Sequence, residues 1–80
     1  MDYSKRWIKI NSTNVKKVRY NQKDKILDVE FQNGIIYRYF NITEEDFREF
    51  MHSNSKGRMI KQLGRFRKYE RLGSAIRNIS

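Results

Sequence analysis

The sequence predicts a small α+β domain, in which an antiparallel meander of three to four strands is followed by two or three short helices packed on one face. Two observations support this fold class. Residues 15–40 hold short segments of alternating apolar and polar residues, separated by turn-forming residues. Residues 43–66 instead space their apolar residues three and four apart, as amphipathic helices do. The chain has 80 residues and no internal repeat, so we expect a single domain over residues 1–80.

Three segments are predicted to be strands. Residues 15–20 follow a polar break, and two lysines blur their alternation. Residues 26–31 alternate well between apolar and acidic side chains. Asn33 and Gly34 then form the strongest turn signal in the chain, because both tolerate the positive φ of a tight hairpin turn. Residues 35–40 are predicted to be the returning strand.

The length of this hairpin loop decides which side of the sheet Tyr37 and Tyr39 occupy. With a two-residue loop, the two tyrosines share a face with Asp28 and Glu30. The core face then consists of Leu27, Val29, Phe31, Ile36 and Phe40. A loop that is one residue longer on one side reverses this assignment, because strand side chains alternate with a period of two. The sequence leaves both arrangements open.

Two helices are predicted after the strands. Thr43 begins the first helix, since its hydroxyl can cap free backbone N–H groups and the three acidic residues that follow favour the positive end of the helix dipole. The second helix is predicted over about residues 56–66, with Gly64 weakening its interior so that it frays early. Residues 72–80 are expected to form a last short helix or a loose tail. The predicted inner faces carry Phe47, Phe50 and Met51 in the first helix, and Met59, Ile60, Leu63 and Phe66 in the second.

Charge is distributed unevenly along the chain. The formal net charge is +9, to which residues 1–23 contribute +6, residues 24–50 contribute −4 and residues 51–80 contribute +7. A net charge of this size creates a field that draws polyanions. RNA is therefore the expected partner, with another polyanion, an acidic protein or an anionic lipid as alternatives. A basic surface that is merely solvated is the remaining interpretation.

A basic stripe on the second predicted helix is the candidate contact for phosphates, because the planar arginine fork donates two hydrogen bonds at once. Its members are Arg58, Lys61, Arg65 and Lys68, extended by Arg71. A helix face balanced against the acidic middle of the chain is the alternative reading of this stripe. A second basic patch is expected if the first strand lies beside that helix, and it would consist of Lys16, Lys17 and Arg19.

Tyr37 and Tyr39 bear on the same question. Displayed on a sheet, their rings would stack on unpaired bases. Buried, they would be core residues whose hydroxyls reach a partner. In a chain this short, we expect at least one of the two to be core or half-buried, with Arg38 between them pointing the opposite way.

The order and spacing of several short motifs resemble those of the KTSC domain, a small module found at the C-terminus of some lysyl-tRNA synthetases and as free-standing bacterial and phage proteins. The resemblance covers about residues 12–71. It rests on Ser12, on Val15, Val18 and Tyr20, on 27–31 (LDVEF) with Gly34, on the Tyr37-Arg38-Tyr39 centre, on Ile42 before a helix with Phe47 and Phe50, and on Ser55-Lys56-Gly57. Three positions depart from the pattern: Arg19 replaces a usual glycine, Thr43 a common proline, and Gly64 an aliphatic residue before Arg65. The resemblance implies a small antiparallel sheet with helices, and a module thought to bind RNA without catalytic residues.

The residue set does not support catalysis. The chain has no cysteine, and its one histidine, His52, is expected at the surface of a polar loop. The acidic residues at 44–49 are expected to serve the helix dipole rather than a metal, and the glycines lack a phosphate-cradling spacing. We therefore expect no enzymatic activity, no cofactor and no metal site. The first 12 residues are too short and too interrupted for a signal peptide or a membrane span, which favours a cytoplasmic protein.

Two functions from different classes follow. The first is a non-enzymatic nucleic-acid-binding module, with RNA preferred, that contacts phosphates through the basic helix stripe. The alternative is a protein-interaction factor, such as a phage-encoded regulator, that docks on an acidic partner protein. The alternative predicts an exposed apolar patch beside the basic residues, for example around Trp7.

Overall fold

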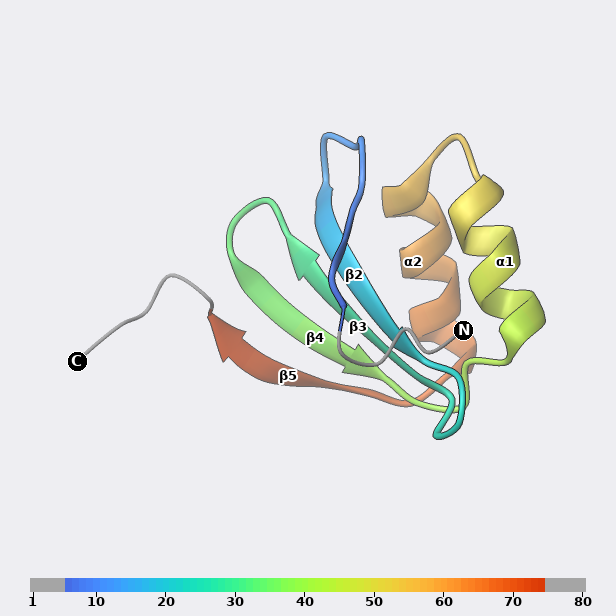
Figure 1. The fold of residues 1–80 in the computed structure, drawn as a ribbon. Coiled ribbons are helices and arrows are strands. Elements are labelled where there is room, and N and C mark those ends of the chain that lie inside the picture. The colour runs from blue at the N-terminus through green and yellow to red at the C-terminus, as the bar shows by residue number, and fades with distance from the viewer. Residues whose placement is uncertain (1–5, 75–80) are drawn as a thin grey trace.

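The computed structural model describes residues 6–74 of the chain as five strands and two helices (Figure 1). In chain order these are β1 (Ile8–Lys9), β2 (Val15–Asn21), β3 (Ile26–Phe31), β4 (Ile35–Tyr39), α1 (Glu44–His52), α2 (Lys56–Phe66) and β5 (Tyr69–Ser74). The first four strands form a meander, and β5 returns after the helices to pair with β4. The α+β class is confirmed, but the antiparallel sheet has five strands rather than three to four.

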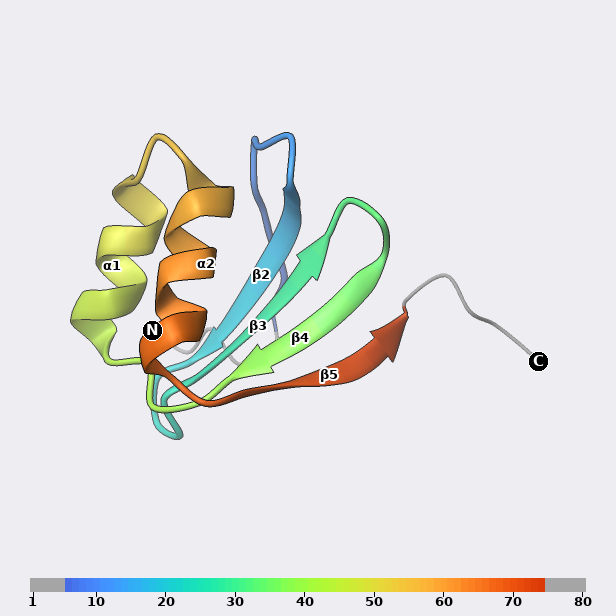
Figure 2. The ribbon, with the colours of Figure 1, turned by 180° about the vertical axis from the view of Figure 1, so that it is seen from behind.

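The two helices lie side by side over one face of the sheet, as the view from behind shows (Figure 2). Side chains from this face and from both helices form a single core. Its fully covered members include Val18, Tyr20, Leu27, Val29 and Phe50. Because strand side chains alternate, the residues between them point to the opposite face, which no described helix covers. No helix within residues 6–74 is long and apolar enough to cross a membrane.

The β3–β4 hairpin has a three-residue loop, so the register with a two-residue loop is wrong. Leu27 pairs with Tyr39 and Val29 with Tyr37. Gly34 has a φ of 88°, and its N–H donates to the Phe31 carbonyl over 2.8 Å. A glycine in this left-handed conformation is usual in three-residue hairpin loops. The consequence is that the two tyrosines share the helix-covered face, whereas Ile36 and Phe40 do not join the predicted core.

The first helix begins as predicted. Thr43 and Asp46 form a reciprocal capping box, with the Thr43 hydroxyl accepting from the Asp46 N–H over 3.0 Å and the carboxylate accepting from the Thr43 N–H over 3.1 Å. Phe47 stacks on the ring of Tyr20 with a centroid distance of 4.4 Å. The Tyr20 hydroxyl donates to the Ile42 carbonyl over 2.7 Å, which joins β2 to the chain just before α1.

The second helix does not fray early, because it continues through Phe66 and ends with the Arg67 N–H donating to the Leu63 carbonyl over 2.8 Å. Ile60 and Leu63 are buried as predicted. Phe66 is 75% exposed, so its predicted place on the inner face is wrong. It is the last residue of the helix, where the periodic face extends beyond the elements that cover it.

The C-terminal segment corrects a further expectation. Residues 72–74 belong to β5 rather than to a short helix, and residues 75–80 of that expected helix or tail lie outside the described residues. In β5, Tyr69 pairs with Tyr39 and Arg71 pairs with Tyr37. This pairing places a third tyrosine beside the two that the hairpin turns toward the helices.

Candidate nucleic-acid interface

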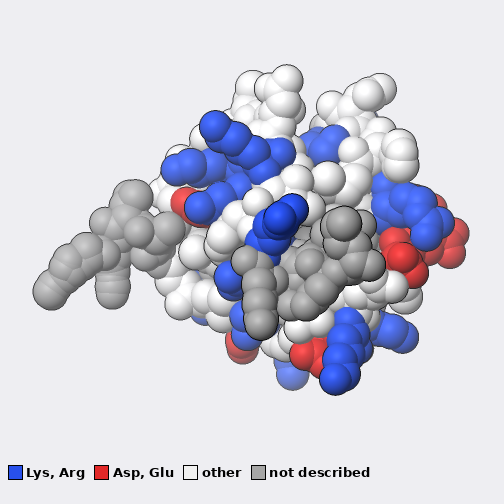
Figure 3. All heavy atoms as spheres, viewed as in Figure 1, with Lys and Arg blue, Asp and Glu red and all other residues white. Residues whose placement is uncertain are grey.

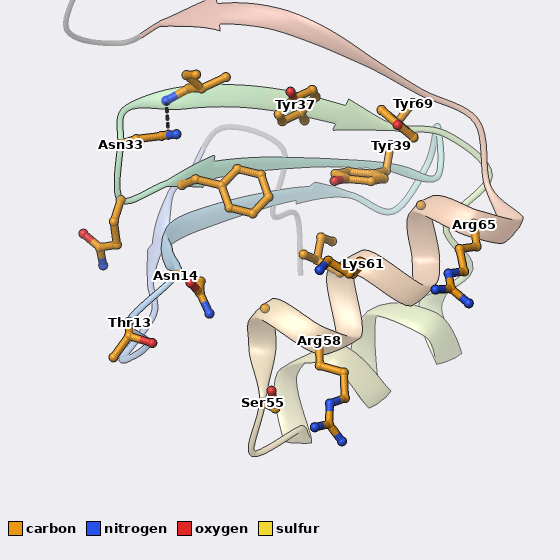
Figure 4. Close-up of a pocket in the computed structure, with 16 residues that line it drawn as sticks. Thr13, Asn14, Asn33, Tyr37, Tyr39, Ser55, Arg58, Lys61, Arg65 and Tyr69 are labelled. Atoms are coloured by element: carbon orange, nitrogen blue, oxygen red, sulfur yellow. Dashed lines mark hydrogen bonds between the residues drawn. The ribbon is translucent and has the colours of Figure 1, made fainter.

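A cleft of about 1060 Å³ lies between α2 and the inner face of β3, β4 and β5 (Figure 4). The helices cover one part of that face, and the cleft is the part that they leave open. Four aromatic residues of the strands line it: Phe31, Tyr37, Tyr39 and Tyr69. Three basic residues of α2 line it from the other side: Arg58, Lys61 and Arg65. The polar loops that precede β2 and β4 close one end.

The aromatic residues form one continuous floor. Tyr37 lies between Phe31 and Tyr69 in edge-to-face contacts, with centroid distances of 5.7 Å and 5.8 Å. Tyr39 and Tyr69 lie 5.4 Å apart. Such spacings are typical of favourable aromatic pairs, so the rings stabilise one another before any ligand is bound.

The rings differ in how far they are displayed. Tyr39 is 6% exposed, and its burial, with smaller effects from Tyr69 and Tyr37, raises the pKa of its hydroxyl to about 12. Tyr69 is 51% exposed, while Tyr37 and Phe31 are half-buried. The expectation that at least one of the two central tyrosines is core or half-buried is therefore confirmed. Tyr39 belongs to the core, whereas Tyr69 offers the most open ring of the floor.

Gly64 lies on the side of α2 that faces the tyrosine rings. A Cβ atom at this position would lie 3.6 Å from the rings of both Tyr39 and Tyr69. Any longer side chain would fill the cleft at this point. The residue that departs from the expected family pattern thus keeps the floor open beneath α2.

Only part of the predicted basic stripe lines the cleft. Arg58, Lys61 and Arg65 are spaced three and four residues apart and are all exposed. None of the three forms an ion pair with any residue in the described range 6–74. In Figure 4, Lys61 lies on the sheet side of α2, and the two arginines extend from the helix toward solvent. Lys68 and Arg71 are exposed but lie outside the lining, Lys68 just after the helix and Arg71 on β5.

The second predicted patch lies elsewhere. The side chains of Lys17 and Arg19 point to the face of the sheet opposite the helices, because the buried Val18 between them points inward. Lys16 accompanies them as the extra residue of a β-bulge between Val15 and Lys17. These three residues and the cleft face opposite directions.

The comparisons with known proteins agree with this architecture. The model of the KTSC domain matches residues 11–63, which is more than half of the chain. The chain belongs to the KTSC domain family. A crystal structure of a KTSC domain protein from Yersinia pestis superposes with a TM-score of 0.77 at 20% identity, covering 85% of this chain and 97% of that one. An uncharacterized protein of Stutzerimonas stutzeri (strain A1501) is 29% identical over 56 residues, 70% of this chain and 79% of the relative.

In this KTSC domain, the opposite face of the sheet carries its own ion pairs. Asp28 is 3% exposed and accepts from Arg38 Nε over 2.8 Å and from Arg19 Nη2 over 2.9 Å. Burial alone would raise the pKa of Asp28, but the hydrogen bonds from the two guanidinium groups hold that pKa below its usual value. Glu30 is 2% exposed and lies 3.5 Å from Lys17 Nζ and 3.9 Å from Lys16 Nζ.

Trp7 also belongs to this opposite face. Its ring lies 4.4 Å from the Arg19 guanidinium and 5.0 Å from Lys17 Nζ, and the residue is half-buried. An exposed apolar patch was expected around Trp7, but the large exposed apolar side chains lie elsewhere. Those are Phe66, Tyr69 and Leu72, at the end of α2 and on β5. Blue side chains cover more of the molecular face in Figure 3 than red ones do, in keeping with the net charge of +9.

Sequence reasoning missed Tyr69 and the loop residues at the closed end of the KTSC domain's cleft. No strand signal marked Tyr69, because residues 69–72 (YERL) place their apolar side chains three positions apart rather than in alternation. The family match ends at residue 63, so neither Tyr69 nor Arg65 lies within it. The loop residues carried no signal, because their position in the cleft follows from how two separate loops meet.

Proposed function

We propose that this KTSC domain is a non-enzymatic module that binds single-stranded RNA in the cleft beneath α2. One observation carries the proposal: an aromatic floor and three cations that form no ion pair within residues 6–74 line the same cleft. Proteins that bind single-stranded nucleic acid combine these two features, because bases stack on rings while the backbone follows the basic side.

The floor favours unpaired bases over a duplex. Tyr69 and the half-buried Phe31 and Tyr37 are the rings that a ligand could contact. A base within a duplex is already stacked on both faces, so only a splayed base can lie on such a ring. The fold therefore suits a loop, a bulge or a single strand of RNA.

The charges favour the cleft over the opposite face as the phosphate contact. Arg58, Lys61 and Arg65 have no carboxylate partner in residues 6–74, whereas Lys17 and Arg19 each have one. A phosphate at the opposite face would compete with the buried carboxylates of Asp28 and Glu30, and breaking such pairs is costly. An anion reaching α2 meets no such competition.

The non-enzymatic part of the proposal rests on the side chains that are present. His52 is exposed at the end of α1, where its Nδ1 lies 2.9 Å from the Arg48 carbonyl oxygen. No group of three or more His, Cys, Asp or Glu residues able to hold a metal ion occurs in the part of the chain that the structure describes. The cleft itself is lined by aromatic, aliphatic, basic and neutral polar side chains, a set suited to binding.

A titration with labelled nucleic acids tests the proposal. Single-stranded RNA, a structured RNA and duplex DNA would be compared by fluorescence anisotropy at low and at physiological salt. We expect saturable binding that prefers single-stranded RNA and persists at physiological salt. Tyr69→Ala should weaken that binding by about 1–3 kcal/mol, the usual value of one base–aromatic stack.

Phe66→Ala is the matched control, because Phe66 is an exposed ring at the end of α2 that does not line the cleft. It should leave RNA affinity unchanged. Equal affinity for all three nucleic acids, lost entirely at physiological salt, would contradict the proposal and leave only generic charge.

Docking on an acidic partner protein is the second candidate function, and one observation favours it. Phe66 and Leu72 are exposed apolar side chains that flank the basic residues Lys68 and Arg71 in sequence. Exposed aromatic side chains beside arginines are typical anchors of protein interfaces. Under this alternative, Phe66→Ala rather than Tyr69→Ala would abolish capture of a stoichiometric acidic protein.

A further inference from the structure

The closed end of the cleft has a chemistry different from that of its basic side. Asn14 from the loop before β2, and Gln32 and Asn33 from the hairpin loop before β4, line this end together with Thr13 and Ser55. All five side chains are neutral and polar. The cations of the cleft come from α2 alone, with Arg58 in the first turn of the helix near this end, whereas the neutral hydrogen-bonding groups come from the loops.

The two loops hold each other in place. The Gln32 N–H donates to the Asn14 carbonyl over 2.9 Å. The Gln32 side-chain Nε2 donates to the Ser12 carbonyl over 3.0 Å and to the Val15 carbonyl over 3.4 Å. These bonds use the donor half of the Gln32 carboxamide and leave its Oε1 as an acceptor.

The two asparagines complete the set. The Asn33 Oδ1 accepts from the Ile35 N–H over 3.0 Å, which fixes the side chain and leaves its Nδ2 as a donor. The Asn14 carboxamide makes no hydrogen bond with the described residues, and Figure 4 shows it pointing toward the N-terminal end of α2. The Asn33 Nδ2 donor, the Gln32 Oε1 acceptor and the whole Asn14 carboxamide therefore lie at one end of the aromatic floor.

Phosphate contacts position a nucleic acid, whereas contacts to base edges determine which sequence is bound. We propose that this amide-lined end, formed by Asn14, Gln32 and Asn33, reads the edge of one unpaired adenine. The inference rests on the proposed RNA-binding function and adds a base preference to it. Phe31 directly precedes Gln32 and lines the cleft, so a base that stacks on Phe31 lies at this end.

Adenine is the base that a carboxamide matches best. It presents a donor next to an acceptor, N6 beside N7, which asparagine and glutamine bind with two hydrogen bonds. An unpaired adenine exposes both its Watson–Crick and its Hoogsteen edge. Each edge pairs one donor with one acceptor, whereas the Hoogsteen edge of guanine carries acceptors alone.

Eight-nucleotide RNAs of adenine, cytosine or uracil test the inference in anisotropy titrations at one salt concentration. The wild-type protein should bind the adenine RNA about 5- to 150-fold more tightly than the uracil RNA, the range for one bidentate base contact. Asn14→Ala should remove most of this preference while leaving the affinity for the uracil RNA unchanged. Gln62→Ala is the matched control, since Gln62 is an exposed carboxamide of α2 outside the cleft lining.

Asn14→Ala removes no side-chain hydrogen bond within residues 6–74, and its thermal unfolding should match that of the wild type. Gln32→Met serves as a second variant that keeps the side-chain length and removes the acceptor. Because it also removes the Nε2 hydrogen bonds to Ser12 and Val15, its thermal unfolding is measured together with its RNA affinity. Equal affinity for the three RNAs, or a preference for another base, would overturn the adenine site while leaving the RNA-binding function intact. Absence of binding to all three RNAs would overturn the proposed function itself.

Discussion

Replacing Arg58, Lys61 and Arg65 together by glutamine removes the three cations that line the cleft and lowers the net charge from +9 to +6. All three side chains are exposed and lack an ion pair within residues 6–74, so the fold should be retained. Each phosphate neutralised on a single strand contributes about 0.7 to the slope of log affinity against log salt. If each cation contacts one phosphate, the slope should decrease by about 2 in the variant.

The expected effect is large enough to measure directly. Between about 50 and about 200 mM salt, the wild type should lose roughly 20-fold more affinity than the variant, because their slopes differ by about 2. Anisotropy titrations of a single-stranded RNA at four or five salt concentrations give the slope for each protein. The wild type should therefore weaken steeply with salt, and the variant should weaken much less.

A charge-matched variant separates the cleft from the overall charge. Lys9, Lys23 and Arg48 are exposed and lie outside the cleft lining, so replacing them by glutamine lowers the net charge by the same amount. This control should keep the wild-type slope. The reasoning is refuted if the control flattens the slope as much as the cleft variant does, because long-range charge alone would then account for binding.

Three further predictions concern stability. Gly64→Ala should raise the free energy of unfolding in urea by up to about 1 kcal/mol, because alanine favours a helix interior. The new Cβ would lie 3.6 Å from the tyrosine rings, which is an ordinary contact. A loss of stability would show that the cleft cannot accept a methyl group. Tyr20→Phe keeps the ring but leaves the Ile42 carbonyl without its 2.7 Å hydrogen bond, and should cost about 1–3 kcal/mol by the same measurement; an unchanged midpoint would contradict a buried bond. The pKa values of Asp28 and Asp46 are lowered by hydrogen bonds from arginine, for Asp46 also from Thr43, despite the opposing effect of burial. In acid, the unfolded state therefore binds more protons than the folded state. The stabilisation from the two carboxylates should be fully present above about pH 4 and should decrease as the pH falls through their folded-state pKa values. In Asp28→Asn, the loss of stability with falling pH should be smaller.

The elements whose stability is local were predictable from the sequence. The Thr43 cap, the bounds of α2 and the burial of Phe47, Phe50, Ile60 and Leu63 all follow from residues within one or two turns of each other. The strand pattern of residues 26–31 is likewise a short-range signal. These features needed no knowledge of the rest of the chain.

The features that depend on distant contacts were not predictable in the same way. The Asn33-Gly34 signal fits loops of two or three residues equally well, and only the register of the folded hairpin shows that the longer loop places both tyrosines on the helix-covered face. β5 forms a strand because it pairs with β4, from which both helices separate it in sequence. The cleft depends on both outcomes, so the basic residues of α2 were identified from sequence while the ring that faces them most openly, Tyr69, was not.

The late return of β5 has a consequence for how the cleft is assembled. Strands β1 to β4 pair with neighbours along the chain, but β5 can dock only after α1 and α2 have brought it back to the sheet. Closing such a non-local contact is slow relative to forming a hairpin, so β5 is expected to dock last and, as an edge strand, to undock before the inner strands β2, β3 and β4. Because Tyr69 travels with β5, a ligand held between this ring and α2 would favour the docked strand. Ligand binding should then slow hydrogen exchange at the amides of β5 more than at those of β2 or β3.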